Sequence, residues 1–233
     1  MELSQAIRRR RMVRDFTPEP IPEPVLTRIL DRALHIPSAG FAQGTELVVL
    51  SEPHQVAEFW RLTDPRARKR SPRGGDPPVI VLPMADKGAY LRRYSEPDKQ
   101  GLGMDQEEGW PVPYWDLDTA MAVMVMLLAA VDEGLGAWYF GIFHGEPELL
   151  RWLRVPDGCR PIGAVALGYP SPREVARGSA VSRRRRPLED VVHRGGWGSS
   201  ISPHRCSEEV LRESGKHQRP HSITGEAAGQ DPQ

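Results

Sequence analysis

The segment from Tyr114 to Glu133 constrains the fold of this chain more than any other stretch. It is apolar almost all round, through Ala120, Met121, Val123, Met124, Val125, Met126, Leu127, Leu128 and Val131. A helix of this composition has no polar face to present to water, so other elements must bury it. Gly134-Leu135-Gly136 follows and ends the helix. The sequence therefore predicts a central helix with strands and further helices packed around it.

Shorter patterns place the remaining elements. Further helices are expected near the N-terminus, where Ser4 caps a turn carrying Leu3, Ala6 and Ile7, and over Pro24–Leu34 and Glu146–Leu153. Strands are expected over Glu46–Leu50, Val79–Leu82, the start of Ala137–Phe143, and Ile162–Leu167. Pro65–Pro78 is expected to be a mobile loop, and Asp86–Pro113 a turn-rich excursion with one short helix. This uneven alternation favours an α+β fold, a mixed sheet flanked by helices with a buried central helix, over a doubly wound parallel sheet.

The length of 233 residues suits one domain and a tail. We assign residues 1–198 to the domain and residues 199–233 to a disordered tail, because the tail has no apolar periodicity. No signal peptide opens the chain, and the apolar run from Ala120 to Val131 is too short to span a bilayer. A cytoplasmic protein without a membrane partner is expected.

Two arginine clusters lie near the two ends of the predicted domain. The first is Arg8–Arg11 with Arg14, and the second is Arg183–Arg186. If the fold brings them together, they form a site for a phosphate or another dianion, since the guanidinium donates two parallel hydrogen bonds. Separate solvated stretches, or a nucleic-acid patch, are the alternatives. The formal net charge of zero argues against a general nucleic-acid binder.

Several common sites are not indicated by the sequence. No GxGxxG follows a strand, and neither GxxxxGK[ST] nor GxSxG occurs. Cys159 and Cys206 do not have a metal-ligand spacing, and His35 and His144 stand beside turns without an obvious acidic partner. We therefore expect no metal site and no histidine-based catalytic triad.

An ordered series of motifs carries a family resemblance. It comprises Arg-Arg-Met-Val-Arg-Asp-Phe at 10–16, Ile-Pro-Ser-Ala-Gly-Phe-Ala-Gln at 36–43, Gly-Leu-Gly-Ala at 134–137, Leu-Gly-Tyr-Pro at 167–170, and the closing Arg-x-Arg-x-Pro-Leu. In this order the motifs resemble the FMN-dependent nitroreductase family, over residues 3 to about 194. The resemblance implies a mixed sheet flanked by helices and a homodimer with two FMN molecules in clefts at the subunit interface.

The resemblance also implies which residues of one chain hold the cofactor. Arg10, Arg11 and Arg14 match the basic motif that holds the FMN phosphate, ribityl chain and pyrimidine edge. Met12 stands where a serine is common, so one hydroxyl contact is lost. Tyr139, Phe140, Gly141 and Ile142 match the stretch on one flavin face, where a backbone N–H approaches N5. Arg183 and Arg185 match the pair that closes on the phosphate, with the register within Arg183–Arg186 open by one residue.

The remaining cofactor residues are expected from the partner subunit. Pro37, Ser38 and Ala39 match a turn that lies along the flavin of the other chain, and Gln43 is kept. Phe41 stands where asparagine is usual, and Gly44-Thr45 replaces Pro-Trp. These departures leave the pyrimidine contacts and the substrate range open.

The function implied is an NAD(P)H-dependent FMN oxidoreductase that works by a ping-pong cycle on nitroaromatic, quinone or related small-molecule acceptors. No protein residue is expected to be catalytic, because flavin N5 carries the hydride. Trp110, Tyr114 and Trp115 are expected to line the substrate cleft, to act as a lid, or to pack at the dimer interface. The alternatives are specialised flavin chemistry (dehalogenation, dehydrogenation or use of a deazaflavin), a flavin- or ligand-binding protein without turnover, and a basic interaction module for nucleic acid.

Overall fold

The computed structural model describes residues 1–64, 75–176 and 179–199. It divides into two units, residues 1–177 and 178–233. The first unit contains the sheet and most of the helices. The second contains the short helix α7 (Ser179–Ser182). Most of the predicted Pro65–Pro78 loop and nearly all of the predicted tail from residue 199 lie outside the described residues.

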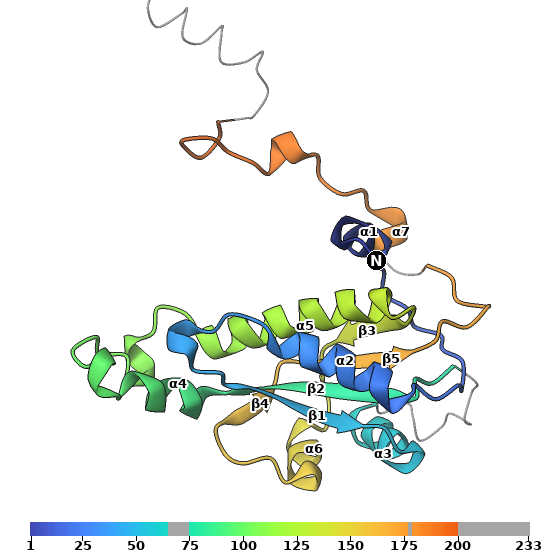
Figure 1. Ribbon diagram of the computed structural model, residues 1–233, viewed down its shortest axis with the longest axis horizontal. Helices are drawn as coiled ribbons and strands as arrows, with labels where there is room; N and C mark the ends of the chain where they lie inside the picture. Colours follow the sequence, from blue (N-terminus) through green and yellow to red (C-terminus); the bar gives the residue numbers. More distant parts are fainter. Residues whose placement is uncertain (65–74, 177–178, 200–233) are drawn as a thin grey trace, which may run out of the picture. The chain divides into compact units, whose positions relative to one another are not determined.

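One antiparallel sheet organises the first unit (Figure 1). Its strands run in the order β1 (Thr45–Leu50), β2 (Val79–Asp86), β5 (Ala164–Gly168) and β3 (Gly136–Phe140), and β4 (Cys159–Pro161) pairs with the end of β2. All these pairs are antiparallel. β2 runs four residues beyond the predicted Val79–Leu82. Strands β1 and β3 therefore lie at opposite edges, separated by β2 and β5.

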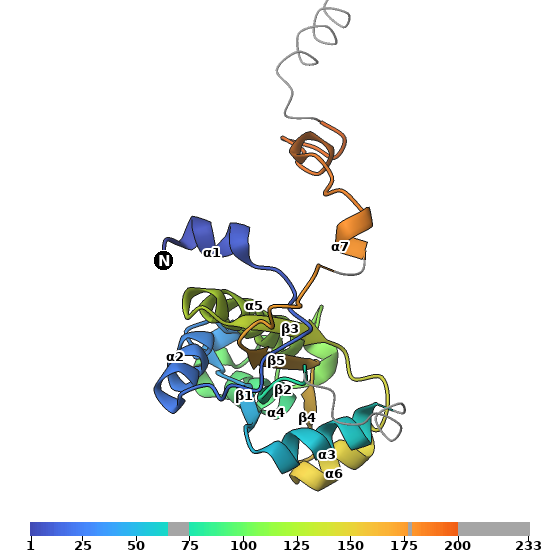
Figure 2. The same ribbon diagram turned by 90° about the vertical axis from the view of Figure 1, so that its right-hand side faces the viewer.

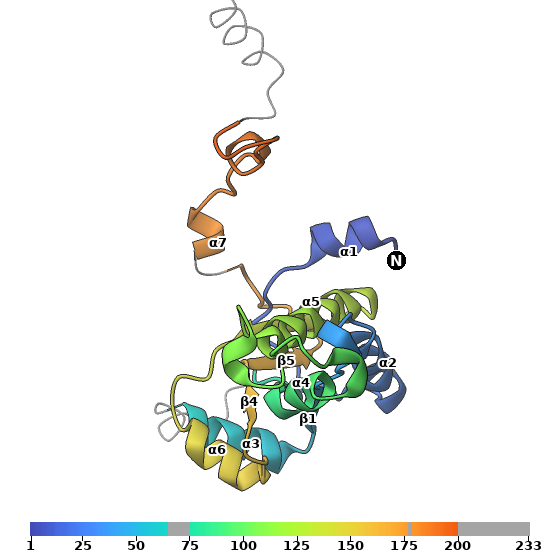
Figure 3. The same ribbon diagram turned by 90° about the vertical axis from the view of Figure 1, so that its left-hand side faces the viewer.

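Helices cover both faces of the sheet (Figures 2 and 3). On one face Val79 and Val81 pack against α2 (Glu23–Leu34) and α5 (Tyr114–Asp132). On the other face Ile80 and Leu82 pack against α3 (Pro53–Thr63) and α6 (Glu146–Leu153). This alternation is what a strand buried on both faces requires. The predicted α+β class with a helix-flanked sheet is confirmed.

The central helix forms as predicted and ends where its glycine indicates. Gly134 has a φ of 77°, and Leu135 N–H donates to the Ala130 carbonyl at 2.7 Å, as in a Schellman C-cap. The burial of α5 is one-sided in a single chain. Leu117, Met121 and Met124 are 45%, 44% and 41% exposed. These three residues, called here the open α5 face, form an apolar stripe on the side away from the sheet.

By length and composition α5 could also cross a membrane, with a mean hydropathy of 1.5. Half of that stretch is buried inside the protein, where Met126 and Ala130 are fully covered. The core helix of a soluble protein has the same character. The packing of α5 on the sheet is consistent with a soluble protein.

Some local predictions were wrong or incomplete. Helix α1 (Leu3–Arg9) begins after Glu2 and has no side-chain cap, so Ser4 is not its cap. Helix α3 was not predicted, although Gln55 at its third position accepts a hydrogen bond from Glu52 N–H at 3.2 Å. The short helix expected in the excursion is α4 (Lys87–Tyr94).

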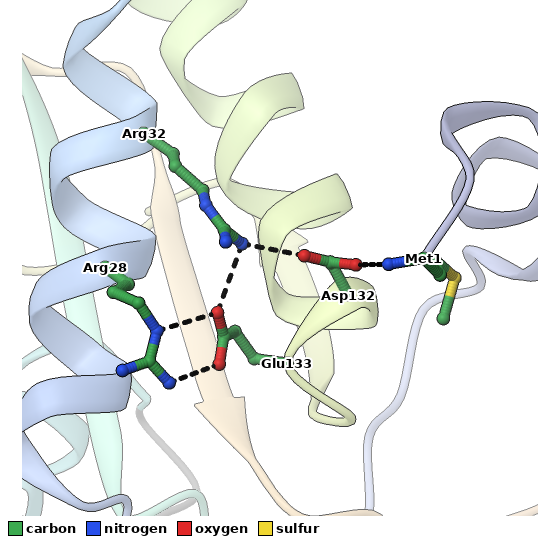
Figure 4. A network of polar contacts seen from close by, with 5 residues as sticks. All are labelled: Met1, Arg28, Arg32, Asp132 and Glu133. Carbon is green, nitrogen blue, oxygen red and sulfur yellow. Dashed lines mark hydrogen bonds and ion pairs between the residues drawn. The ribbon is translucent and has the colours of Figure 1, made fainter.

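A network of charged groups joins α2 to the end of α5 (Figure 4). Arg28 donates to both carboxylate oxygens of Glu133, at 3.0 and 2.6 Å. Arg32 lies 2.9 Å from Asp132 and 3.1 Å from Glu133, and the Met1 amino group also pairs with Asp132. Two carboxylates at a helix C-terminus are unfavourable to the helix dipole, and the cations offset this.

The network predicts a pH-dependent contribution to stability. The hydrogen bond from Arg28 lowers the pKa of Glu133, and burial opposes this in part. A carboxyl with a lowered folded pKa stabilises the fold above its ordinary pKa and loses that effect as the pH falls through the lowered value. Glu133→Gln should therefore cost up to about 1 kcal/mol near pH 7, and less below about pH 4.

Urea unfolding at pH 7 and pH 3 measures this difference. The matched control is Asp157→Asn, at an exposed position without an ion pair among the described residues. An equal cost of Glu133→Gln at both pH values would contradict the assignment.

Candidate cofactor site

The N-terminal basic motif is held against the edge of β3. Val13 N–H donates to the Ala137 carbonyl at 2.9 Å, and Met12 forms an isolated parallel bridge with Ala137. Further along, Phe16 forms an antiparallel bridge with Pro170. The fold therefore brings together three of the sequence motifs, at residues 10–16, 134–137 and 167–170.

Glu174, which the sequence did not single out, organises the same segment. Its side chain is 1% exposed and accepts a hydrogen bond from Arg14 N–H at 3.1 Å. Its second oxygen lies 3.9 Å from the Arg11 guanidinium. The Arg14 guanidinium lies over the Trp138 ring, 5.6 Å from the ring centroid, in cation–π geometry. Arg11 is thus partly neutralised, and Arg14 lies beside an aromatic surface.

Arg10 has a buried donor that fits an anionic ligand. Its Nη1 atom is buried and has no hydrogen-bond partner among the residues that the structure describes. Arg8 and Arg9, in the preceding helix, are exposed instead. A buried unpaired guanidinium N–H is costly, and a phosphate oxygen would satisfy it with a charge-assisted bond. Arg10 therefore fits the role that the motif predicts.

An aromatic cleft opens at the end of β3. Its volume is about 360 Å³, and its lining includes Phe140, Gly141, Ile142 and Phe143. The Phe140 ring stacks on Trp60 with centroids 5.4 Å apart and planes at 10°. A Cβ atom at Gly141 would lie 2.8 Å from the Phe143 ring, which is 85% exposed and is free to swing aside. The cleft offers flat apolar walls of the kind that an aromatic ring system packs against.

Tyr139 faces the other side of the strand from this cleft. It packs with the core cluster on the α2 and α5 face, whereas Phe140 packs with the α3 side. Its hydroxyl donates to the Ile162 carbonyl at 2.6 Å, and burial raises the pKa of the phenol. Of the four residues predicted along the flavin face, three line the cleft and Tyr139 does not.

The predicted turn at Pro37–Gln43 lies at the opposite edge, just before β1. Ser38 Oγ accepts a hydrogen bond from Gln43 N–H at 3.0 Å. Gly40, Phe41 and Gln43 have φ values of 60°, 56° and 53°. Left-handed conformations are uncommon for residues with a side chain and persist where surrounding contacts enforce them. The turn holds the Phe41 side chain 69% exposed, beside a cavity of about 590 Å³ that Ser38 and Gln43 also line.

One chain does not bring all predicted residues together. Arg10–Arg14 and the cleft lie at the β3 edge, and the turn lies at the β1 edge. Arg183 and Arg185 are exposed residues of the second unit. Their approach to Arg10 remains a prediction.

The structure also shows the surroundings of the histidine, metal-ligand and aromatic candidates. His35 has an acidic neighbour after all, because its Nε2 lies 3.6 Å from Asp31. Within the described ranges, no group of three or more His, Cys, Asp or Glu side chains could hold a metal ion. Trp110 and Trp115 are 7% and 5% exposed and pack edge-on against Tyr90, so they form core rather than a lid.

Close packing at Gly136 makes a further prediction about this site. A Cβ atom there would lie 2.7–2.8 Å from the side-chain atoms of Val13. Gly136→Ala should therefore push the basic segment away from β3 and destabilise the fold by about 1–3 kcal/mol, the usual cost of overpacking. Urea unfolding measures this cost. The double variant Gly136→Ala/Val13→Ala should recover most of the loss, and no recovery would show that the clash is not with Val13.

Comparisons with known proteins find relatives over most of the chain. The sequence model of the nitroreductase family matches residues 7–169. The chain is 24% identical over 174 residues to a Methanothermobacter thermautotrophicus protein named as an NADH dehydrogenase/NAD(P)H nitroreductase, covering 73% of this chain and 78% of that one. It is also 24% identical over 199 residues to the FMN reductase [NAD(P)H] of Bacillus subtilis, covering 82% and 73% of the two chains.

A solved structure shares the fold. It is a Desulfovibrio desulfuricans protein named as a nitroreductase in complex with FMN. The TM-score is 0.59 at 24% identity, and the match covers 82% of this chain and 95% of that one. The arrangement of strands and helices described above is therefore one that known proteins adopt.

Proposed function

Since the chain belongs to the nitroreductase family, we propose that it is an FMN-dependent oxidoreductase that takes hydride from NADH or NADPH and passes it to nitroaromatic, quinone or related acceptors. The names of the two relatives and the FMN complex of the structural neighbour support this assignment. We place the protein in the cytoplasm, as the sequence predicts.

The residues at the β3 edge fit FMN. Arg10 would bind the phosphate, with Arg183 or Arg185 closing on it, and the Arg14 guanidinium would stabilise negative charge on the pyrimidine side. Phe140, Gly141 and Ile142 would pack against one face of the ring. When bound, FMN supplies hydride transfer at N5, so the protein's own task is to bind, orient and exclude water. The observation that carries the proposal is the buried, unpaired Arg10 Nη1, in a segment bound along β3, the strand whose other end opens into the aromatic cleft.

We also propose a homodimer in which each site uses two chains. The sheet order keeps the turn at Pro37–Gln43 away from the cleft of its own chain. A second chain is needed to bring Ser38, Ala39 and Phe41 to a flavin held by Arg10. The open α5 face offers an apolar surface for that association.

Colour and bleaching test the function. The purified protein should be yellow, with an absorption band near about 450 nm, and anaerobic NADH or NADPH should bleach it. Reoxidation by a quinone or a nitroaromatic would complete the ping-pong cycle. A yellow protein that neither nucleotide bleaches would indicate a flavin-binding protein without this turnover, and a colourless one that cannot be loaded with FMN would refute the cofactor.

Phe41 should shift acceptor preference. Its side chain is exposed on the turn at Pro37–Gln43 and cannot hydrogen-bond the flavin pyrimidine. Phe41→Asn should tighten FMN by roughly 1 kcal/mol and lower the preference for flat apolar acceptors. The measurement is the ratio of kcat/KM for a quinone to that for a small nitroaromatic, in wild type and variant. An unchanged ratio would place Phe41 away from the flavin.

A further inference from the structure

A buried carboxylate in the central helix contacts the turn that precedes β1. Asp118 lies within α5 and is 4% exposed. Its Oδ2 atom accepts two hydrogen bonds, from Tyr90 Oη at 2.8 Å and from Ala39 N–H at 2.9 Å. No ion pair joins Asp118 to a cation among the described residues. A carboxylate placed in an apolar helix without a counter-ion is expensive, so stability alone explains it poorly.

The turn that Asp118 holds needs such support. It contains three residues with left-handed backbone, and two of them, Phe41 and Gln43, carry side chains. Each costs about 1–2 kcal/mol in conformational energy, so the turn persists only where surrounding contacts fix it. Three hydrogen bonds provide those contacts. Asp118 binds Ala39 N–H, Ser38 Oγ binds Gln43 N–H, and Arg93 Nε donates to the Gly40 carbonyl at 2.8 Å.

We propose that Asp118, oriented by Tyr90, is a positioning residue for the cofactor cleft of the second chain. Its carboxylate fixes Ala39 N–H and thereby sets where Ser38 and Phe41 lie. Tyr90 donates to the same carboxylate oxygen, and its ring packs edge-on against the Trp110 and Trp115 rings. Asp118 touches neither flavin nor acceptor. The proposal rests on the proposed function, in which this turn lies along FMN.

Three variants separate the parts of this arrangement. Asp118→Ala removes the acceptor and frees Ala39 N–H. Asp118→Asn keeps an acceptor oxygen for the same two donors, so it should rescue most of the effect. Tyr90→Phe keeps the ring packing and the bond to Ala39 and should be intermediate. The control is Thr119→Val, which removes the neighbouring buried hydroxyl that contacts Thr45 at 3.0 Å but does not contact the turn.

The first measurement needs no flavin. Hydrogen–deuterium exchange of the peptide covering residues 38–43, in the full chain without cofactor, should be faster in Asp118→Ala and close to wild type in Asp118→Asn and Thr119→Val. The second measurement is FMN affinity and the visible circular dichroism of the bound flavin. Asp118→Ala should weaken FMN by about tenfold and change the dichroism, since the acceptor that fixes Ala39 N–H is lost.

The outcomes distinguish the two proposals. Faster exchange in a chain that never binds FMN would refute the proposed function and leave Asp118 as the support of the turn without a cofactor to position. Wild-type exchange together with wild-type FMN affinity in Asp118→Ala would overturn the positioning role. An equal loss in Thr119→Val would also overturn it, because the effect would then be general. If Asp118→Ala does not fold, wild-type exchange and wild-type FMN affinity in Tyr90→Phe would overturn the role, because intermediate losses are expected there.

Discussion

Replacing Arg10 by alanine is expected to weaken FMN binding by about 1.5–3 kcal/mol, the range for a lost hydrogen bond to a charged group. The Nη1 atom of Arg10 is buried and unpaired in the described chain, so it has already lost water without gaining a protein partner. A phosphate oxygen is the acceptor that the motif implies. Arg185→Ala should produce a loss of similar size if the second arginine cluster closes on the same phosphate.

Titration of the apo-protein with FMN, followed by flavin fluorescence, measures both losses. The control is Arg8→Ala, which removes an equal charge from an exposed position two residues earlier. A double variant that loses less than the sum of the single losses would indicate that the two arginines share one ligand group. If Arg10→Ala retains the wild-type affinity, or if Arg8→Ala loses as much, the phosphate assignment is wrong.

Charges on the open α5 face should abolish both dimer and cofactor. Met121 and Met124 are each more than 40% exposed in one chain. In the proposed dimer they would be covered, and an unpaired charge buried there costs about 3–5 kcal/mol. Met121→Glu with Met124→Glu should therefore give a monomer that no longer retains FMN. Each single chain should remain folded, since the glutamates face water there.

Light scattering at low micromolar concentration and the flavin content of the same sample test this pair of losses. Met121→Leu with Met124→Leu keeps the volume and apolar character and should stay dimeric and yellow. Leu102→Glu places a charge at another exposed apolar position, outside α5, and should change neither property. A wild-type protein that is monomeric and fully loaded would remove the basis of the two-chain site.

The features of the fold that could be predicted from the sequence are those that depend on a local pattern of residues. Helix α5 was identifiable because its apolar character extends over most of its 19 residues and Gly134 follows its C-terminal end. The sequence did not show that α5 is buried on one side only. An apolar stripe that a second chain would cover has the same composition as an apolar stripe that the sheet covers. Helix α3 was missed although Val56, Phe59 and Trp60 recur at helical spacing, and a second signal is the Glu52 and Gln55 pair at its start.

Asp118 and Glu174, which hold the segments of the candidate site in place, were not predicted for a different reason. Asp118 hydrogen-bonds residues 28 and 79 positions away, and Glu174 binds a backbone group 160 positions away. No periodicity encodes such contacts, since they depend on how the strands are ordered. Phe41, by contrast, was singled out from the sequence, because it departs from the family motif. Its left-handed backbone conformation could not be predicted.

The opposite-edge placement of the turn and the cleft has a genetic consequence in the proposed dimer. Each chain contributes a different half to each of two sites, so a substitution in either half appears in both sites of a homodimer. Chains that carry defects in different halves behave otherwise. When they pair, one site receives both defects and the other receives none. Two chains that are each inactive alone then form a heterodimer with one intact site, and the pattern of complementing pairs would divide the site residues into the two edges of the sheet.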